Sequence, residues 1–130
     1  MKKVIVLMCF LFLVVGCKDN EDKKEMIKDN SNKISITKVS CNEMKELVKE
    51  GAILIDVREI DEYDSEHLDN AINISYTVIG DKIKDVVDDL EKDIIVYCRS
   101  GARSSKAAST LINAGYKNIY DLGSIDNCMD

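Results

Sequence analysis

Cys98 is the residue in this sequence best placed to act as a nucleophile. The apolar run 94–97 precedes it, and the short loop 99–103 follows before a helix-like segment that begins at Ser104. Such a loop forms an anion site, because its backbone N–H groups converge and the helix N-terminus adds partial positive charge. A thiolate is stabilised there more than a thiol. We therefore interpret Cys98 as a reactive thiolate, which requires inward-facing amides around a sulfur that solvent can reach.

The loop after Cys98 offers two kinds of group for binding an anionic substrate. Arg99 and Arg103 add two positive charges, and Ser100, Gly101 and Ala102 are small enough for a substrate to approach their backbone N–H groups. These five are the candidate substrate-binding residues. Two alternatives stay open: Arg99 can face outward and only attract the substrate, and Arg103 can form a structural ion pair.

Strand-like and helix-like patterns alternate around this loop. We expect strands at 34–39, 52–57, 71–75, 94–97 and 119–122, and helices at 41–50, 59–66, 83–90 and 104–114. This order predicts a three-layer α/β domain with a mostly parallel central sheet of about five strands and helices on both faces. Ligands bind at the carboxyl ends of the strands in such sheets, where Cys98 and Asp56 are expected.

Composition and charge exclude several kinds of partner. The chain has 18 basic and 24 acidic residues and a net charge of −6. Without residues 1–17, 16 basic and 24 acidic residues remain, a net charge of −8. An acidic surface argues against nucleic-acid binding and against adhesion to anionic lipid. The cysteine spacings match no metal site, so we expect no bound metal. We also expect that the protein needs no cofactor and is a monomer.

Residues 1–17 have the pattern of a bacterial signal peptide. They begin with Met-Lys-Lys, continue with an apolar run too short for a comfortable membrane span, and end at a cysteine. The segment Leu13–Cys17 resembles the lipobox of lipoproteins, which implies a lipid anchor on Cys17 and an extracytoplasmic location on the bacterial cell membrane. An ordinary secretory signal or an N-terminal anchor helix are the alternatives. Residues 18–33 are polar and predict a flexible tether, followed by one folded domain at 34–130.

Short motifs recur throughout the folded part: ILIDVRE (53–59), EYDSEHL (62–68), AINI (71–74), VYCRSGARS (96–104) and NIYDLGSI (118–125). Together they resemble the rhodanese-homology sulfurtransferases over about residues 34–130. The resemblance implies a rhodanese-like fold in which Cys98 accepts a sulfane sulfur as a persulfide. It also implies that 99–103 is the active-site loop.

The chemistry that this resemblance implies is sulfur transfer in two steps. The Cys98 thiolate would attack the outer sulfur of a small anion such as thiosulfate, and sulfite would leave. The persulfide would then give its sulfur to a thiophilic acceptor, cyanide or a thiol, with ping-pong kinetics. Arsenate reductases and dual-specificity phosphatases have a similar fold, but their loop is one residue longer. The shorter loop here, and Tyr97 in place of a histidine before the cysteine, disfavour phosphatase activity.

Two other functions stay open, a non-catalytic rhodanese-type binding module and a thiol-redox protein that uses Cys98 and Cys128. Cys128 stands near a position where family members commonly have tryptophan, which puts the closure of the last helix in doubt. It can also be a small buried or frayed residue. Cys41 is expected to be core-facing or inert. The odd number of cysteines outside the signal segment and Cys17 argues against a full disulfide framework and predicts a free thiol.

Three further residues are expected to be structural. Asp56 and Arg58 should form an internal ion pair that holds strand to loop, although they could also polarise the site. His67, the only histidine, should pack and form hydrogen bonds. Tyr63 should lie in the core.

Overall fold

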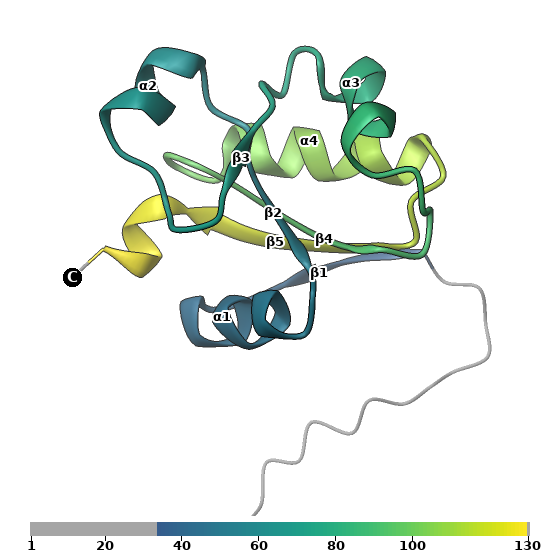
Figure 1. Ribbon diagram of the computed structural model, residues 1–130, viewed down its shortest axis with the longest axis horizontal. Coiled ribbons are helices and arrows are strands. Elements are labelled where there is room, and N and C mark those ends of the chain that lie inside the picture. The colour runs from purple at the N-terminus through teal and green to yellow at the C-terminus, as the bar shows by residue number, and fades with distance from the viewer. Residues whose placement is uncertain (1–33, 130) are drawn as a thin grey trace, which may run out of the picture. The chain divides into compact units, whose positions relative to one another are not determined.

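The fold is a parallel sheet between two layers of helices (Figure 1). The computed structural model describes residues 34–129, so the signal peptide and tether predicted at 1–17 and 18–33 lie outside the described residues. The sheet has five strands, all parallel to their neighbours, in the order β1 (Ser35–Lys38), β5 (Asn118–Ser124), β4 (Asp93–Cys98), β2 (Ile53–Asp56) and β3 (Ile72–Asn73). The predicted fold class is confirmed.

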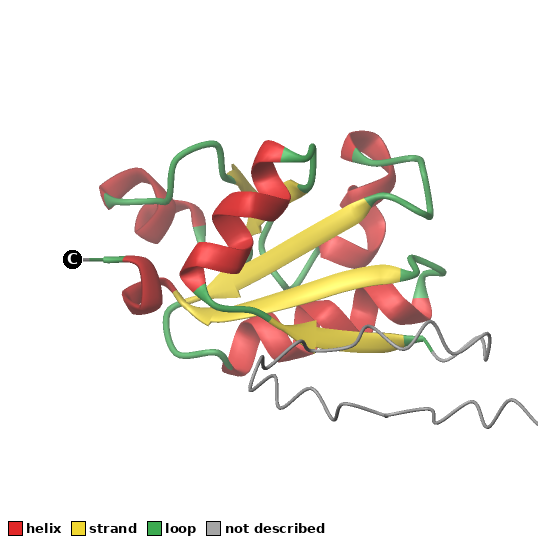
Figure 2. Cartoon of the chain, turned by 90° about the horizontal axis from the view of Figure 1, so that it is seen from below, coloured by secondary structure: helices red, strands yellow, loops and turns green. Residues whose placement is uncertain are grey.

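Helices cover both faces of this sheet. They are α1 (Cys41–Lys49), α2 (Ile60–Ser65), α3 (Ile79–Val86) and α4 (Ala102–Asn113), and a 3₁₀ helix, η1 (Ile125–Cys128), follows β5. In Figure 1, α1 lies on one side of the sheet and α3 and α4 on the other; Figure 2 views the sheet from the α1 side. No helix of residues 34–129 has the length and apolar content needed to cross a membrane.

The two faces have separate apolar cores. The larger core lies under α3 and α4 and includes Ile55, Val96 and Leu111. The smaller core lies under α1 and includes Met44 and Ile95. Neighbouring residues of one strand therefore enter opposite cores, as the period of two requires. This explains why β4 is apolar at every position from Ile94 to Tyr97: both of its faces are buried.

The structure differs from the sequence prediction at several element bounds. Helix α3 begins at Ile79 and ends at Val86, earlier at both ends than the predicted 83–90, because Ile79 and Ile83 are its fully buried residues. The carbonyl of Leu90 accepts a hydrogen bond from the N–H of Lys117, so Leu90 belongs to the connection before β4. Strand β3 is only two residues long, and α4 begins two residues before the predicted Ser104.

A β-bulge shapes the sheet beside the end of β4. Val96 pairs with Asp121, but the next residue of β4 pairs with Gly123, so Leu122 is an extra residue on β5. Gly123 has a φ of +78°, a conformation that favours glycine, and its N–H donates to the buried Asp121 carboxylate over 2.9 Å. The bulge sets Ser124 opposite Cys98, and so sets where the chain after β5 meets the loop that follows Cys98.

Candidate active site

Cys98 ends β4, and the loop after it directs backbone N–H groups at its sulfur. The N–H of Gly101 donates to Cys98 Sγ over 2.9 Å. Gly101 is the N-cap of α4 and has a φ of +97°, a left-handed conformation that a residue with a side chain adopts only with strain. The Ser104 hydroxyl donates to the Gly101 carbonyl over 3.0 Å and closes the turn. The predicted arrangement of amides facing a sulfur at a strand-to-helix loop is present.

These contacts favour the ionised form of Cys98. Burial raises the pKa of the thiol, since it disfavours charge. Hydrogen bonds from the backbone of Ser104, Gly101 and Ser100 lower the pKa, and the nearby hydroxyl of Ser104 lowers it as well. The lowering contributions are larger, so the pKa of Cys98 lies below its ordinary value. Cys98 is also the free cysteine of residues 34–129, as the sequence predicted.

The sulfur is less accessible than the sequence interpretation required. Cys98 is 0% exposed and belongs to the larger core, whereas Arg99 and Ser100 are exposed. The reason is that α4 and the end of β5 close over the last residue of a central strand. Cys98 therefore has no solvent-exposed surface in this structure.

The two loop arginines have different surroundings. Arg103 donates to both carboxylate oxygens of Glu62, with Nη1–Oε2 at 2.6 Å and Nη2–Oε1 at 2.9 Å. This is the ion pair that the sequence left open, and it lowers the pKa of Glu62 to about 2. Arg99 is exposed and forms no ion pair with another residue of the described range. Its carbonyl accepts a hydrogen bond from Ser124 Oγ over 2.6 Å, which fixes the loop to the end of β5.

The predicted internal ion pair between Asp56 and Arg58 is confirmed. Both residues are buried, and Arg58 Nη2 lies 2.7 Å from Asp56 Oδ2. The same guanidinium donates to the carbonyl of Glu66 and lies over the Tyr97 ring, 5.9 Å from its centre. The pair therefore joins the end of β2 to the segment after α2, and its charges are satisfied within the protein.

His67 has the structural role that the sequence predicted. Its Nδ1 lies 2.9 Å from the Tyr63 carbonyl, and its ring stacks on the Tyr63 ring with centroids 3.8 Å apart. The Tyr63 hydroxyl donates to the carbonyl of Ala71 over 2.8 Å, and the residue packs against the smaller core.

Cys41 and Cys128 form a disulfide, which the sequence analysis did not predict. The expectation that Cys41 faces the core is confirmed, since it packs against the smaller core, whereas the alternative that it is inert is wrong. Cys128 does not pair with Cys98. The two cysteines are 87 positions apart, yet their Cα atoms lie 5.3 Å apart, because η1 folds back over the start of α1 beside the smaller core. The bond closes the end of the domain, where the sequence left closure in doubt.

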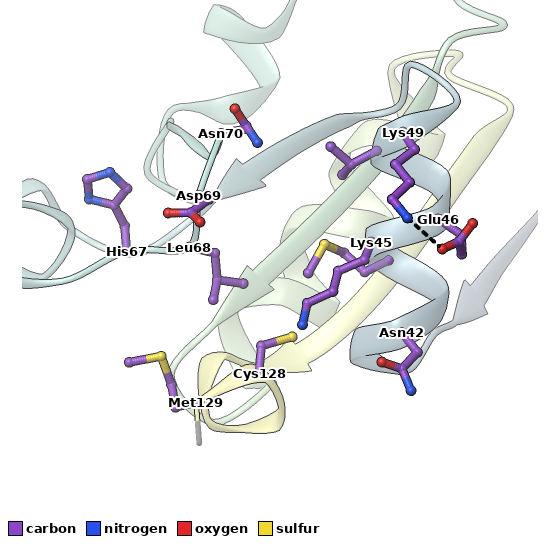
Figure 3. Close-up of a pocket in the computed structure, with 12 residues that line it drawn as sticks. Asn42, Lys45, Glu46, Lys49, His67, Leu68, Asp69, Asn70, Cys128 and Met129 are labelled. Atoms are coloured by element: carbon purple, nitrogen blue, oxygen red, sulfur yellow. Dashed lines mark hydrogen bonds and ion pairs between the residues drawn. The ribbon is translucent and has the colours of Figure 1, made fainter.

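A cavity of about 640 Å³ lies between α1, the turn at 67–70 and the end of η1 (Figure 3). Cys128 lines it, and no residue of the loop 98–103 does. It is therefore separate from the Cys98 site. No group of three or more potential metal-ligating side chains occurs among residues 34–129.

Three residues that support the Cys98 loop were not among the site residues predicted from the sequence. Ser104 had a detectable signal, since hydroxyls in the first turn of a helix commonly bond to the turn before it. Glu62 lies in a recognisable motif, but its partner is 41 positions away. Ser124 gave no signal, because its position depends on the bulge in β5.

The sequence is similar to proteins of a known family. The family described as the rhodanese-like domain matches residues 40–127, more than half of the chain. The chain belongs to the rhodanese family. The thiosulfate sulfurtransferase GlpE of Coxiella burnetii is 38% identical over 85 residues, which are 65% of this chain and 78% of GlpE. The tRNA uridine(34) hydroxylase of Hamiltonella defensa is 32% identical over 87 residues, 63% of this chain, but the match spans only 24% of the hydroxylase.

Solved rhodanese structures have the same fold. A rhodanese with anions from E. coli is 31% identical, with a TM-score of 0.58 over 59% of this chain and 91% of that one. The human single-domain sulfurtransferase TSTD1 has a TM-score of 0.64 over 73% of this chain and 96% of its own. At 21% identity, TSTD1 supports the fold alone.

Proposed function

We propose that this rhodanese is a sulfurtransferase that moves a sulfane sulfur from thiosulfate or a related donor to a thiophilic acceptor. The observation that carries this proposal is the Cys98 sulfur at the end of β4, which accepts a hydrogen bond from the N–H of Gly101, the N-cap of α4, and has a lowered pKa. The thiosulfate sulfurtransferases among the relatives support the same reaction class.

The reaction balances without a cofactor. The Cys98 thiolate attacks the outer sulfur of thiosulfate, the Cys98 S–S bond forms, the donor S–S bond breaks, and sulfite leaves with its electron pair. Cyanide or a thiolate then attacks the outer sulfur of the persulfide, takes that sulfur and returns the Cys98 thiolate. The loop amides stabilise negative charge on sulfur in both steps.

Full burial of Cys98 requires a loop movement in the first step. Arg99, Ser100 and Ala102 of the loop are exposed, and one side-chain hydrogen bond, from Ser124 to the Arg99 carbonyl, fixes the loop to β5. The same burial favours the alternative of a rhodanese-type binding module without catalysis.

Thiocyanate formation from thiosulfate or polysulfide and cyanide tests the proposal. The wild type should form thiocyanate with ping-pong kinetics, and Cys98→Ser should form none. The matched control is Cys41→Ser/Cys128→Ser, which removes the other cysteines of the domain and should retain turnover. A wild type that forms no thiocyanate with any sulfane donor would support the binding module.

We propose further that the protein is held outside the cytoplasm by a lipid on Cys17. The lipobox-like segment at 13–17 supports the anchor. The Cys41–Cys128 disulfide supports an oxidising compartment, because disulfides rarely persist in the cytosol. Labelled fatty acid should enter the wild type in cells and remain in the membrane fraction, and Cys17→Ser should lose both the label and the membrane association. Equal labelling of both proteins would reject the anchor.

A further inference from the structure

The charges around the Cys98 loop are largely balanced within the protein. Both terminal nitrogens of Arg103 donate hydrogen bonds to the Glu62 carboxylate, and Arg58 forms an ion pair with Asp56 in the interior. Of the three arginines among residues 34–129, Arg99 is the one that forms no ion pair with another described residue. The site therefore offers a donor less free positive charge than its two loop arginines indicate.

The surface on the α2 side of the loop is acidic. Glu59 accepts a hydrogen bond from Ser75 Oγ over 2.7 Å and forms no ion pair with a described residue. Three exposed carboxylates follow on or beside α2, at Asp61, Asp64 and Glu66. Residues 34–129 together have 11 basic and 18 acidic side chains, a net charge of −7. A small dianion that approaches Cys98 meets no excess of positive charge.

We propose that Glu62 is a specificity-determining residue that disfavours dianionic sulfur donors by neutralising Arg103. The preferred donor is then one whose leaving group has at most one negative charge, such as the persulfide of a low-charge thiol. This inference rests on the proposed sulfurtransferase function and narrows its donor class.

The two donor classes differ in the charge of the group that leaves. With thiosulfate, the departing sulfite is a dianion, so its departure gains most from a free guanidinium. With an alkyl persulfide R–S–S–H, the Cys98 thiolate bonds to the outer sulfur, the donor S–S bond breaks, and RS⁻ leaves. The proton of the donor passes to RS⁻, which gives RSH and the Cys98 persulfide anion. The loop amides suffice for this smaller charge, because backbone N–H groups already stabilise the Cys98 thiolate.

The geometry of the ion pair makes Glu62 an effective competitor for Arg103. The two carboxylate oxygens of Glu62 accept hydrogen bonds from Arg103 Nη1 and Nη2, which are the nitrogens that a bidentate oxyanion would also use. The side chains of both residues are only about a quarter exposed, 25% for Arg103 and 24% for Glu62, so water screens the pair less than a surface pair. A sulfite or thiosulfate oxygen must displace a carboxylate to reach this guanidinium.

Single-turnover loading of Cys98 with sulfur, followed by intact mass, tests this inference. The donors are thiosulfate and the persulfide of 2-mercaptoethanol, and the variant is Glu62→Gln, whose amide oxygen can still hold Arg103 in place. Wild type should load faster from the persulfide than from thiosulfate. Glu62→Gln should raise the loading constant from thiosulfate roughly tenfold, the scale of one charge-assisted hydrogen bond, and change loading from the persulfide less than about twofold.

Asp64→Asn is the matched control, because it removes the same charge from an exposed position of α2 outside the ion pair. It should leave the preference between the two donors within about twofold of wild type. An unchanged preference in Glu62→Gln, with both proteins still loading sulfur, would overturn the inference and leave the proposed function intact. A wild type that loads sulfur from neither donor would reject the proposed function itself.

Salt dependence of the wild type gives a second readout that needs no variant. Without excess positive charge at the site, thiosulfate loading should stay level or become faster as ionic strength rises, and loading from the neutral persulfide should stay level. A steep fall in thiosulfate loading with added salt would show an excess of positive charge at the site, despite the acidic side chains on and beside α2, and would contradict the role given to Glu62.

Discussion

The N–H of Gly101 donates a hydrogen bond to Cys98 Sγ over 2.9 Å, although Cys98 is fully buried. A buried thiol is ordinarily harder to ionise. Here the loop supplies donors in place of water, so the sulfur is both desolvated and stabilised as an anion. Reactivity at this site therefore depends on two separate properties, the charge state of the sulfur and the opening of the loop.

The first prediction concerns the pH at which Cys98 reacts. Since its pKa is lowered from an ordinary value of 9.0, the rate of alkylation by iodoacetamide should reach half its plateau below pH 9.0. Ser104→Ala removes the hydroxyl contribution and should move this midpoint to higher pH. Ser109→Ala, further along α4, is the control and should not move it. A midpoint in the wild type at or above pH 9.0 would contradict the hydrogen-bonding role of the loop.

The second prediction concerns stability in acid. The folded-state pKa of Glu62 is lowered from 4.5 to about 2, first through its hydrogen bond to Arg103. The ion pair therefore contributes stability that is fully present above about pH 4.5 and is lost as the pH falls toward 2. Glu62→Gln should lower the urea midpoint at pH 7 but have little effect at pH 2. If Glu62→Gln lowered the urea midpoint equally at pH 7 and pH 2, the loss of stability would come from packing and not from the charge of Glu62.

The third prediction concerns the disulfide between Cys41 and Cys128. Cys41→Ser/Cys128→Ser should lose about 2–4 kcal/mol of unfolding free energy, because the bond restricts a long segment of the unfolded chain. Urea unfolding of both proteins, with and without a reducing agent, measures this. The reductant should destabilise the wild type and leave the double variant unchanged. Equal sensitivity of the two proteins to reductant would show that no such bond forms.

The fourth prediction concerns the buried pair of Asp56 and Arg58. Arg58→Met leaves a buried carboxylate without its partner and should cost about 3–5 kcal/mol of unfolding free energy. Asp56→Leu/Arg58→Met removes both charges and should recover much of that loss in the same urea measurement. A double variant as unstable as Arg58→Met would mean that packing and the hydrogen bond to Glu66, and not the charge, account for the cost.

The sequence predicted the features that depend on local pattern. The continuous apolar run of β4 and the alternation of strands and helices gave the sheet and its layers. Helix α1 begins at Cys41 as predicted, and a capping box stabilises its start, with Glu43 N–H donating to Ser40 Oγ and Ser40 N–H donating to Glu43 Oε2. Gly101 was placed in the loop as a backbone donor, and the structure gives it that contact.

What the sequence could not predict depends on residues far apart in the chain. The pairing of Cys41 with Cys128 spans 87 positions and follows from how η1 folds over α1. The burial of Cys98 results from α4 and β5 together, and no local pattern encodes it. The bounds of α3 also shifted, because Ile79 reaches the core while Leu90 does not.

The most direct test of the account is where a transferred sulfur resides. After exposure to thiosulfate, polysulfide or a thiol persulfide, peptide mass spectrometry should find one added sulfur on the peptide that contains Cys98. Cyanide should remove it with formation of thiocyanate. Addition of sulfur only to peptides that contain Cys41 or Cys128, or to no peptide with any donor, would contradict a persulfide mechanism at Cys98.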